Sequence, residues 1–212
     1  MGRPKMIVSA ILIFVIAGTG LFFLTKDSRA DHTTEKTEKV EIQTEDKNTN
    51  PLEKNKYAAI TILIQDYYKK VALGDTDGLS TIVAVLDDTK ASHIKNAEKF
   101  TEAYTDINVY TKEGKQKDSY IAFASYKMKI RDIDTLVPGL DTFYIQKGAG
   151  GTYQICDVPQ YGETADYIAD VTQEEDVQEL VHRVQEEYTQ AAAGDATLQQ
   201  ALDDLQSAYG NE

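Results

Sequence analysis

The sequence predicts an α+β domain that follows one transmembrane helix and a disordered stalk, and three observations predict it. A run of nineteen uncharged residues, 6–24, lies near the N-terminus of the 212-residue chain. A polar and charged stretch follows at 25–55. In residues 56–212 apolar residues recur first at helical spacing, then in alternation, and then at helical spacing again. We therefore expect N-terminal helices, a curled antiparallel sheet and a C-terminal helical hairpin.

The apolar run from Met6 to Leu24 is expected to span a membrane. As a helix it would be ~28 Å long, because each residue adds ~1.5 Å, and the hydrocarbon core of a bilayer is ~30 Å thick. Arg3 and Lys5 precede it, so the positive-inside rule favours a cytoplasmic stub at 1–5. We therefore expect a signal anchor that holds the domain outside the cytoplasm, with the lipid bilayer as the partner of residues 6–24.

A second interpretation of this segment is a cleaved signal peptide. Ser28-Arg29-Ala30 is a small-x-small site, so cleavage near Ala30 would release the rest of the chain as a secreted protein. In both interpretations residues 25–55 are a disordered, charged linker, because they contain too few large apolar residues to offset the entropy of ordering them.

Charge and cysteine content exclude several classes of protein. The net charge is −13, from 22 basic and 35 acidic residues, and residues 157–212 hold fourteen acids against Arg183 alone. Nucleic-acid affinity comes from basic residues that neutralise phosphates, so we expect no nucleic-acid partner for this acidic chain. Cys156 is the single cysteine, which excludes an intramolecular disulfide and a zinc site built from cysteines.

The first part of the domain is expected to be helical. Apolar residues spaced by three and four predict a helix from Tyr57 to Val71. Gly74 would then end this helix, and Asp75 would cap the next segment. A short second helix is expected at 79–86 and a third at 89–105. The third helix would present a stripe of His93, Ala97, Phe100 and Tyr104.

Alternating residues then predict strands at 107–111 and at Tyr120–Arg131. One face of the longer strand is apolar, whereas the other changes from Ile121 and Phe123 to Lys127, Lys129 and Arg131. We therefore expect the first half of this strand to be covered on both faces, and the second face to be exposed to solvent in the last half. After a loop with Pro138-Gly139, segments 142–146 and 152–156 are expected to pair across the glycine-rich turn 148–151.

Two helices are expected to close the domain as a hairpin at 173–208. Thr172 and Glu175 have the spacing of a capping box for the first helix, and Gly194 would end it. Thr197 and Gln200 have the spacing of a capping box for the second helix.

Helices followed by long antiparallel strands resemble the nuclear-transport-factor-two-like fold, a cone-shaped α+β fold. The resemblance covers residues 56–156 and depends on the corner YYKKVALGDTDGL and on INVYTKEGKQKDSYIAFASYKMKIRDIDTLVPGLDTFYI. The second stretch, through Asp134-Thr135 and Pro138-Gly139-Leu140, is similar to extracytoplasmic domains of membrane-anchored proteins from Gram-positive anaerobes. The resemblance implies a cone-like sheet and no particular activity.

The sequence contains no evident set of catalytic, cofactor-binding or metal-ligating residues. Asp75-Thr76-Asp77-Gly78 lacks the later ligands of a calcium loop, and no two histidines have metal-site spacing. Enzymes of the cone fold place an acid, often with a tyrosine, inside the cone. The resemblance therefore makes Tyr120, Tyr126, Asp132 and Asp134 a candidate pocket, in which an aspartate could accept a proton. Solvated turn positions are the competing interpretation of both aspartates.

These features favour a membrane-anchored extracytoplasmic domain that binds or scaffolds within the bacterial cell envelope. We expect it not to be an enzyme, to need no cofactor, and to have an envelope protein or a glycan as its partner. A cone-fold protein with a small-ligand pocket is the alternative, and an enzyme that uses an acid in the cone is the third hypothesis.

Overall fold

The computed structural model describes residues 49–148 and 150–209. The expected stub at 1–5, the transmembrane helix at 6–24 and the linker up to residue 48 lie outside the described residues. Among the residues that are described, no helix is both long and apolar enough to cross a membrane.

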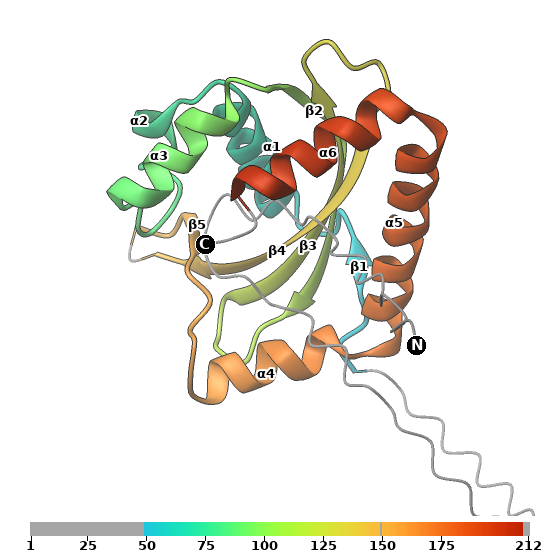
Figure 1. Cartoon of the computed structure of the whole chain (residues 1–212). Helices are drawn as coiled ribbons and strands as arrows, with labels where there is room; N and C mark the ends of the chain where they lie inside the picture. The colour runs from blue at the N-terminus through green and yellow to red at the C-terminus, as the bar shows by residue number, and fades with distance from the viewer. Residues whose placement is uncertain (1–48, 149, 210–212) are drawn as a thin grey trace, which may run out of the picture.

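The described residues form an α+β domain with one antiparallel sheet, as the sequence predicts, and the sheet is open and not closed on itself (Figure 1). The strands are β1 (Glu53–Lys54), β2 (Thr101–Glu113), β3 (Ser119–Ile130), β4 (Val137–Lys147) and β5 (Tyr153–Cys156), and they lie side by side in chain order. The helices are α1 (Ala58–Ala72), α2 (Thr76–Leu79), α3 (Asp88–Ala97), α4 (Glu163–Thr172), α5 (Glu175–Gly194) and α6 (Ala196–Tyr209).

Strand β3 runs through the middle of the sheet and separates two hydrophobic clusters. Its residues Ala122, Ala124 and Tyr126 pack with side chains of α1, α3 and α6. Its residues Ile121 and Phe123 pack with side chains of α4 and α5 on the opposite face. This confirms the predicted alternation along the strand. It also makes the domain three-layered, with helices on both faces of the sheet.

Two of the predicted N-terminal helices differ in the structure. The helix predicted at 79–86 was wrong beyond Leu79: α2 covers Thr76–Leu79, and Val83 forms a parallel bridge with Ile155 of β5. The third helix ends at Ala97, and the chain enters β2 at Thr101. The prediction of a helix up to residue 105 was therefore wrong. Pairing of β2 with β3 outweighs the helical spacing of Phe100 and Tyr104.

Pro138 and Gly139 lie inside β4 rather than in the predicted loop. β5 pairs only with residues 144–147 of β4. At Pro138, the edge of β4 that faces away from β3 therefore has no strand partner. The absence of an N–H at this proline then removes no hydrogen bond between strands. Gly139 is opposite Tyr126 of β3, and a Cβ at this glycine would be 2.4 Å from the tyrosine ring. The glycine therefore makes room for the Tyr126 ring on the sheet.

The C-terminal helices form as predicted, but their caps differ. Thr172 is the last residue of α4, a helix that the sequence did not predict, and its Oγ1 donates to the Ile168 carbonyl at 2.7 Å. It therefore does not cap α5, whose N-cap position is Glu174. α5 ends at Gly194 as expected. Asp195, rather than Thr197, caps α6, because its Oδ1 accepts from the Thr197 and Leu198 amides.

The folded part of the chain begins before residue 56. β1 pairs with β2 through Glu53 and Lys54, and the Asn50 side chain donates to the Glu113 carbonyl at 2.9 Å. Residues 49–55 are thus ordered against the sheet, and the linker predicted to reach residue 55 ends earlier. Polar contacts with the sheet edge order this segment, although it has little apolar surface to bury.

A buried lysine joins this N-terminal segment to α5. The Lys112 side chain is 0% exposed, and its ammonium contacts Glu174 at 2.6 Å, Asp176 at 2.8 Å and the Asn50 carbonyl at 2.9 Å. Asp176 also accepts from the Leu52 amide at 2.9 Å. Three acceptors match the three N–H donors of the ammonium. This junction fixes the start of α5 against β2.

Candidate functional site

The sheet face that packs on α1 carries a cluster of tyrosines around Asp141 of β4. Tyr68 of α1 donates to the Asp141 carboxylate at 2.8 Å, and Tyr126 of β3 donates at 3.4 Å. The Tyr104 ring of β2 lies 4.9 Å from the Tyr68 ring and 5.2 Å from the Tyr126 ring, measured between centroids. Tyr67 extends the cluster, with its ring centroid 5.5 Å from that of Tyr68.

Burial dominates the electrostatics of this cluster. It raises the pKa of Asp141 to about 7, although the hydrogen bonds from Tyr68 and Tyr126 lower it. Burial and the nearby Asp141 carboxylate raise the pKa of Tyr67, Tyr68 and Tyr126 well above the ordinary value. The tyrosines therefore remain neutral hydrogen-bond donors, whereas Asp141 exchanges a proton close to neutral pH.

Side chains fill the space in front of these tyrosines. Leu198 and Leu202 of α6 are buried in the same cluster. The Phe143 ring packs edge-on against Tyr67, with 5.2 Å between centroids. The cavity beside Tyr67, lined also by Ile94 and Ile155, measures about 10 Å³, which is about enough for one water molecule. At this place the face has a packed core and not a ligand-sized cavity.

The four residues of the candidate pocket lie in different places. Tyr126 is in the Asp141 cluster. Tyr120 is near the opposite end of β3, where its ring centroid is 4.5 Å from Tyr57 and 5.7 Å from Tyr153. Asp132 is an exposed turn residue with φ of 62°, and exposed Asp134 forms an ion pair with Lys129 at 3.2 Å. The structure does not bring either aspartate to Tyr126.

Sequence reasoning missed Asp141, although a signal was present. Residues 137, 139, 141, 143 and 145 of β4 share the face that packs on α1, and their flanking members Val137, Phe143 and Ile145 are apolar. An aspartate at a position where the neighbouring residues of the same strand face are apolar is expected to lie against the core, and its carboxylate is then expected to have a shifted pKa. The signal was lost because the strand was expected to begin at residue 142.

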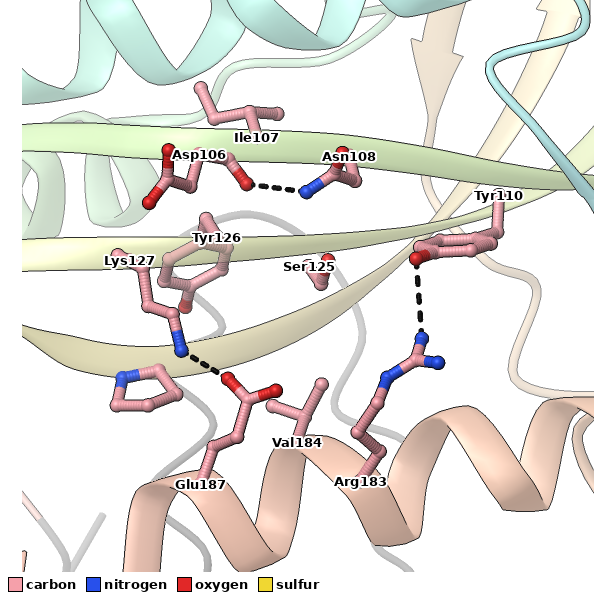
Figure 2. A pocket seen from close by; sticks show the side chains of 11 residues that line it. Asp106, Ile107, Asn108, Tyr110, Ser125, Tyr126, Lys127, Arg183, Val184 and Glu187 are labelled. Carbon is pink, nitrogen blue, oxygen red and sulfur yellow. Dashed lines mark hydrogen bonds and ion pairs between the residues drawn. The ribbon is translucent and has the colours of Figure 1, made fainter. Parts of the chain in front are cut away.

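The opposite face of the sheet has a groove of about 380 Å³ beside α5 (Figure 2). β2 and β3 form its floor and α5 forms its wall. The lining residues are Asp106, Ile107, Asn108, Tyr110, Ser125, Tyr126, Lys127, Pro138, Arg183, Val184 and Glu187. The groove lies where the outward residues of β3 change from Phe123 to Ser125 and Lys127. The end of the strand that the sequence predicts to be wet is therefore the floor of this groove.

A bulge in β2 shapes one end of the groove. The pairing of β2 with β3 shifts register between Thr105 and Asn108, and Asp106 has φ of 50°. The Asn108 side chain donates to the Asp106 carbonyl at 2.8 Å and holds the bulge. A β-bulge changes the direction of nearby side chains and disrupts the hydrogen-bond ladder between two strands. Here the bulge places Asp106 at the groove, whereas the Ile107 side chain packs against the cluster on the α1 face.

Charged side chains from the sheet and α5 meet across the groove. Lys127 of β3 forms an ion pair with Glu187 of α5. Arg183 of α5 donates to the Tyr110 hydroxyl at 3.2 Å, and its guanidinium carbon lies 5.8 Å from the centre of the Tyr110 ring. In the described part of the chain, no carboxylate lies within ion-pair distance of Arg183. The groove therefore contains a guanidinium that is held by an aromatic ring and not neutralised by an acid.

The described residues include no group of three or more histidine, cysteine, aspartate or glutamate side chains that could hold a metal ion. Cys156 is half-buried, and burial raises the pKa of its thiol. No family model matches the chain, and comparisons with curated proteins and with solved structures give no match. Membership of the nuclear-transport-factor-two-like family stays a prediction from the sequence.

Proposed function

We propose that this protein is a membrane-anchored, extracytoplasmic binding domain of the bacterial cell envelope, and that it binds its partner in the groove between the sheet and α5. The uncharged run at 6–24 and the charged linker after it support the location. The polar groove of about 380 Å³ carries the proposal of binding, because its volume lies within the range of small-ligand sites.

The packing of the two sheet faces favours this groove over a pocket in the cone. Tyr68, Tyr104 and Tyr126 pack on one another on the α1 face, and α6 packs on the same cluster. Binding of a small ligand there would need these rings to move apart. The outer groove needs no such rearrangement, since its polar side chains already line an open space.

Site-specific photocrosslinking in intact cells tests this proposal. A diazirine side chain at Ser125 would lie on the groove floor, and the matched control is a diazirine at Ile62, which is 64% exposed on α1. We expect an envelope component to be captured from position 125 and not from position 62. Equal capture from both positions, or none from position 125, would argue against the groove.

A membrane-impermeant maleimide tests the location separately. The Ile62→Cys variant presents an exposed thiol on the outside of the domain. Labelling of this thiol in intact cells is expected for an extracytoplasmic domain. Labelling that appears only after the cells are lysed would place the domain in the cytoplasm.

One observation favours the enzymatic alternative, with a different acid from the two named from the sequence. Burial raises the pKa of Asp141 to about 7, and its carboxylate accepts from the Tyr68 hydroxyl, so it could accept or donate a proton at neutral pH. This hypothesis requires a substrate to reach the carboxylate. Protection of Asp141 from a water-soluble carbodiimide, under conditions in which exposed Asp134 reacts, would argue against it.

A further inference from the structure

One end of the groove presents hydrogen-bond donors without a neutralising acid. Arg183 is the single arginine or lysine within 157–212, and it lies in the groove beside Tyr110 and Ser125. The Tyr110 hydroxyl accepts from Arg183, so its own proton remains available to donate. The guanidinium has five N–H donors in a flat fork, and its contact with Tyr110 uses few of them. This end is suited to an acceptor-rich anionic group.

The opposite end of the groove carries a carboxylate. Asp106 projects from the bulge in β2, and within the described residues its side chain forms no ion pair. In Figure 2, Arg183 and Tyr110 lie at one end of the lining side chains, and Asp106 lies toward the other end, where Lys127 is also drawn. Lys127 and Glu187 neutralise each other. The groove thus has an unneutralised acid at one end and an unneutralised base at the other.

We infer that the groove binds a short peptide with both charged termini free, whose carboxylate contacts Arg183 and whose ammonium contacts Asp106. This inference rests on the proposed function of the groove and names its ligand. Guanidinium and carboxylate match in geometry because two parallel N–H···O bonds can form between them. Pro138 and Val184 also line the groove, although both are largely buried, so the lining is mainly polar.

The arrangement of charges distinguishes a peptide from a glycan. A neutral glycan would leave both Arg183 and Asp106 without a partner, and a uronic acid would leave Asp106 without one. A simple anion would also meet repulsion from the acidic residues 157–212 that surround Arg183 in the sequence. A zwitterionic peptide satisfies both ends without adding net charge.

Calorimetric titration of the full-length chain, kept in detergent micelles because of its apolar N-terminal segment, tests the inference. The probes are trialanine, trialanine amide, N-acetyl-trialanine and glucuronic acid. We expect trialanine to bind, and we expect the amide and Arg183→Gln each to weaken binding about 10–100-fold, because each removes charge-assisted hydrogen bonds. Asp106→Asn, which keeps a residue that tolerates positive φ, is expected to weaken trialanine binding and to abolish the difference between trialanine and its N-acetyl form.

The matched control is Arg131→Gln, because Arg131 is an exposed arginine outside the groove. It is expected to bind trialanine as the unmodified chain does. The inference is overturned if trialanine does not bind, if its amide binds equally, or if glucuronic acid binds as tightly. Capture of a glycan by crosslinking from Ser125, together with no binding of trialanine, would overturn the peptide and leave the groove as the binding site. An absence of crosslinks from Ser125 would count against the proposed function itself.

Discussion

Replacement of Asp141 by asparagine is expected to stabilise the domain above neutral pH. The carboxylate is held among Tyr68, Tyr126 and neighbouring tyrosines, and burial raises its pKa from an ordinary 3.8 to about 7. The folded state therefore binds the proton more tightly than the unfolded state does. The stabilisation is full below pH 3.8, falls as the pH rises toward 7, and is lost above that.

The size of the effect follows from the two pKa values. Each pKa unit corresponds to about 1.36 kcal/mol, so ionisation of Asp141 above pH 7 costs the folded state up to about 4 kcal/mol. Asparagine has no charge to bury. Its side-chain oxygen can accept the hydrogen bond from Tyr68, and its NH₂ group can donate to the Tyr126 hydroxyl. The variant is therefore expected to gain up to about 4 kcal/mol over the natural chain at pH 8 and little at pH 4.

Urea unfolding between pH 4 and pH 8 measures this difference. Other carboxylates also change stability with pH; for example, the Asp195 pKa is lowered by hydrogen bonds from Thr135 and the α6 amides. Their contribution cancels in the difference between variant and natural chain. Asp132→Asn, at an exposed turn, is the matched control and is expected to leave the pH profile unchanged. Parallel profiles for Asp141→Asn and the natural chain would refute the reasoning.

Three further predictions concern the contacts that hold the fold. Lys112→Met removes the buried ammonium at the start of α5 and should lower the free energy of unfolding in urea by about 1–3 kcal/mol, because its charge-assisted hydrogen bonds to two partly exposed carboxylates are lost. Exposed Lys115→Met should lower it by less than about 1 kcal/mol. Gly139→Ala forces a methyl group against the Tyr126 ring. It should lower the free energy of unfolding by about 1–3 kcal/mol, measured as a lower melting temperature. Gly150→Ala, with open space around its Cβ position, should not lower it. Asp195→Ala removes the cap of α6 and should lower the stability of that helix by about 1 kcal/mol. The expected result is faster amide hydrogen exchange in α6, and unchanged exchange would exclude a capping role.

Local patterns in the sequence were sufficient wherever local forces decide the structure. The alternation along β3 predicted which residues share each face of the sheet, and the structure shows that one face packs on α1 and the other on α5. The glycine-rich turn predicted the hairpin of β4 and β5, and Gly194 predicted the end of α5. The change from Phe123 to Ser125 and Lys127 even predicted that one end of the strand is wet, and this is where the groove lies.

The same local patterns failed where a distant partner decides. A helical stripe that included Phe100 and Tyr104 predicted helix, but residues 101–113 pair with β3 along their length. Pro138 and Gly139 predicted a loop, but β3 holds them in a strand whose other side is open there. In both places the sheet hydrogen bonds outweigh the intrinsic preference of the segment.

The sequence by itself determined the α+β class, the order of the main elements, the acidic character and the inward and outward faces of β3, because these follow from residue spacing and charge. Only the tertiary structure decided the environments of the charged side chains. It brings Tyr68 to Asp141 across 73 positions of the chain, Lys112 to Asp176 across 64, and Arg183 to Tyr110 across 73. Burial of one carboxylate, neutralisation of one lysine and exposure of one arginine depend on which distant side chains are brought into contact, and no local pattern contains that information.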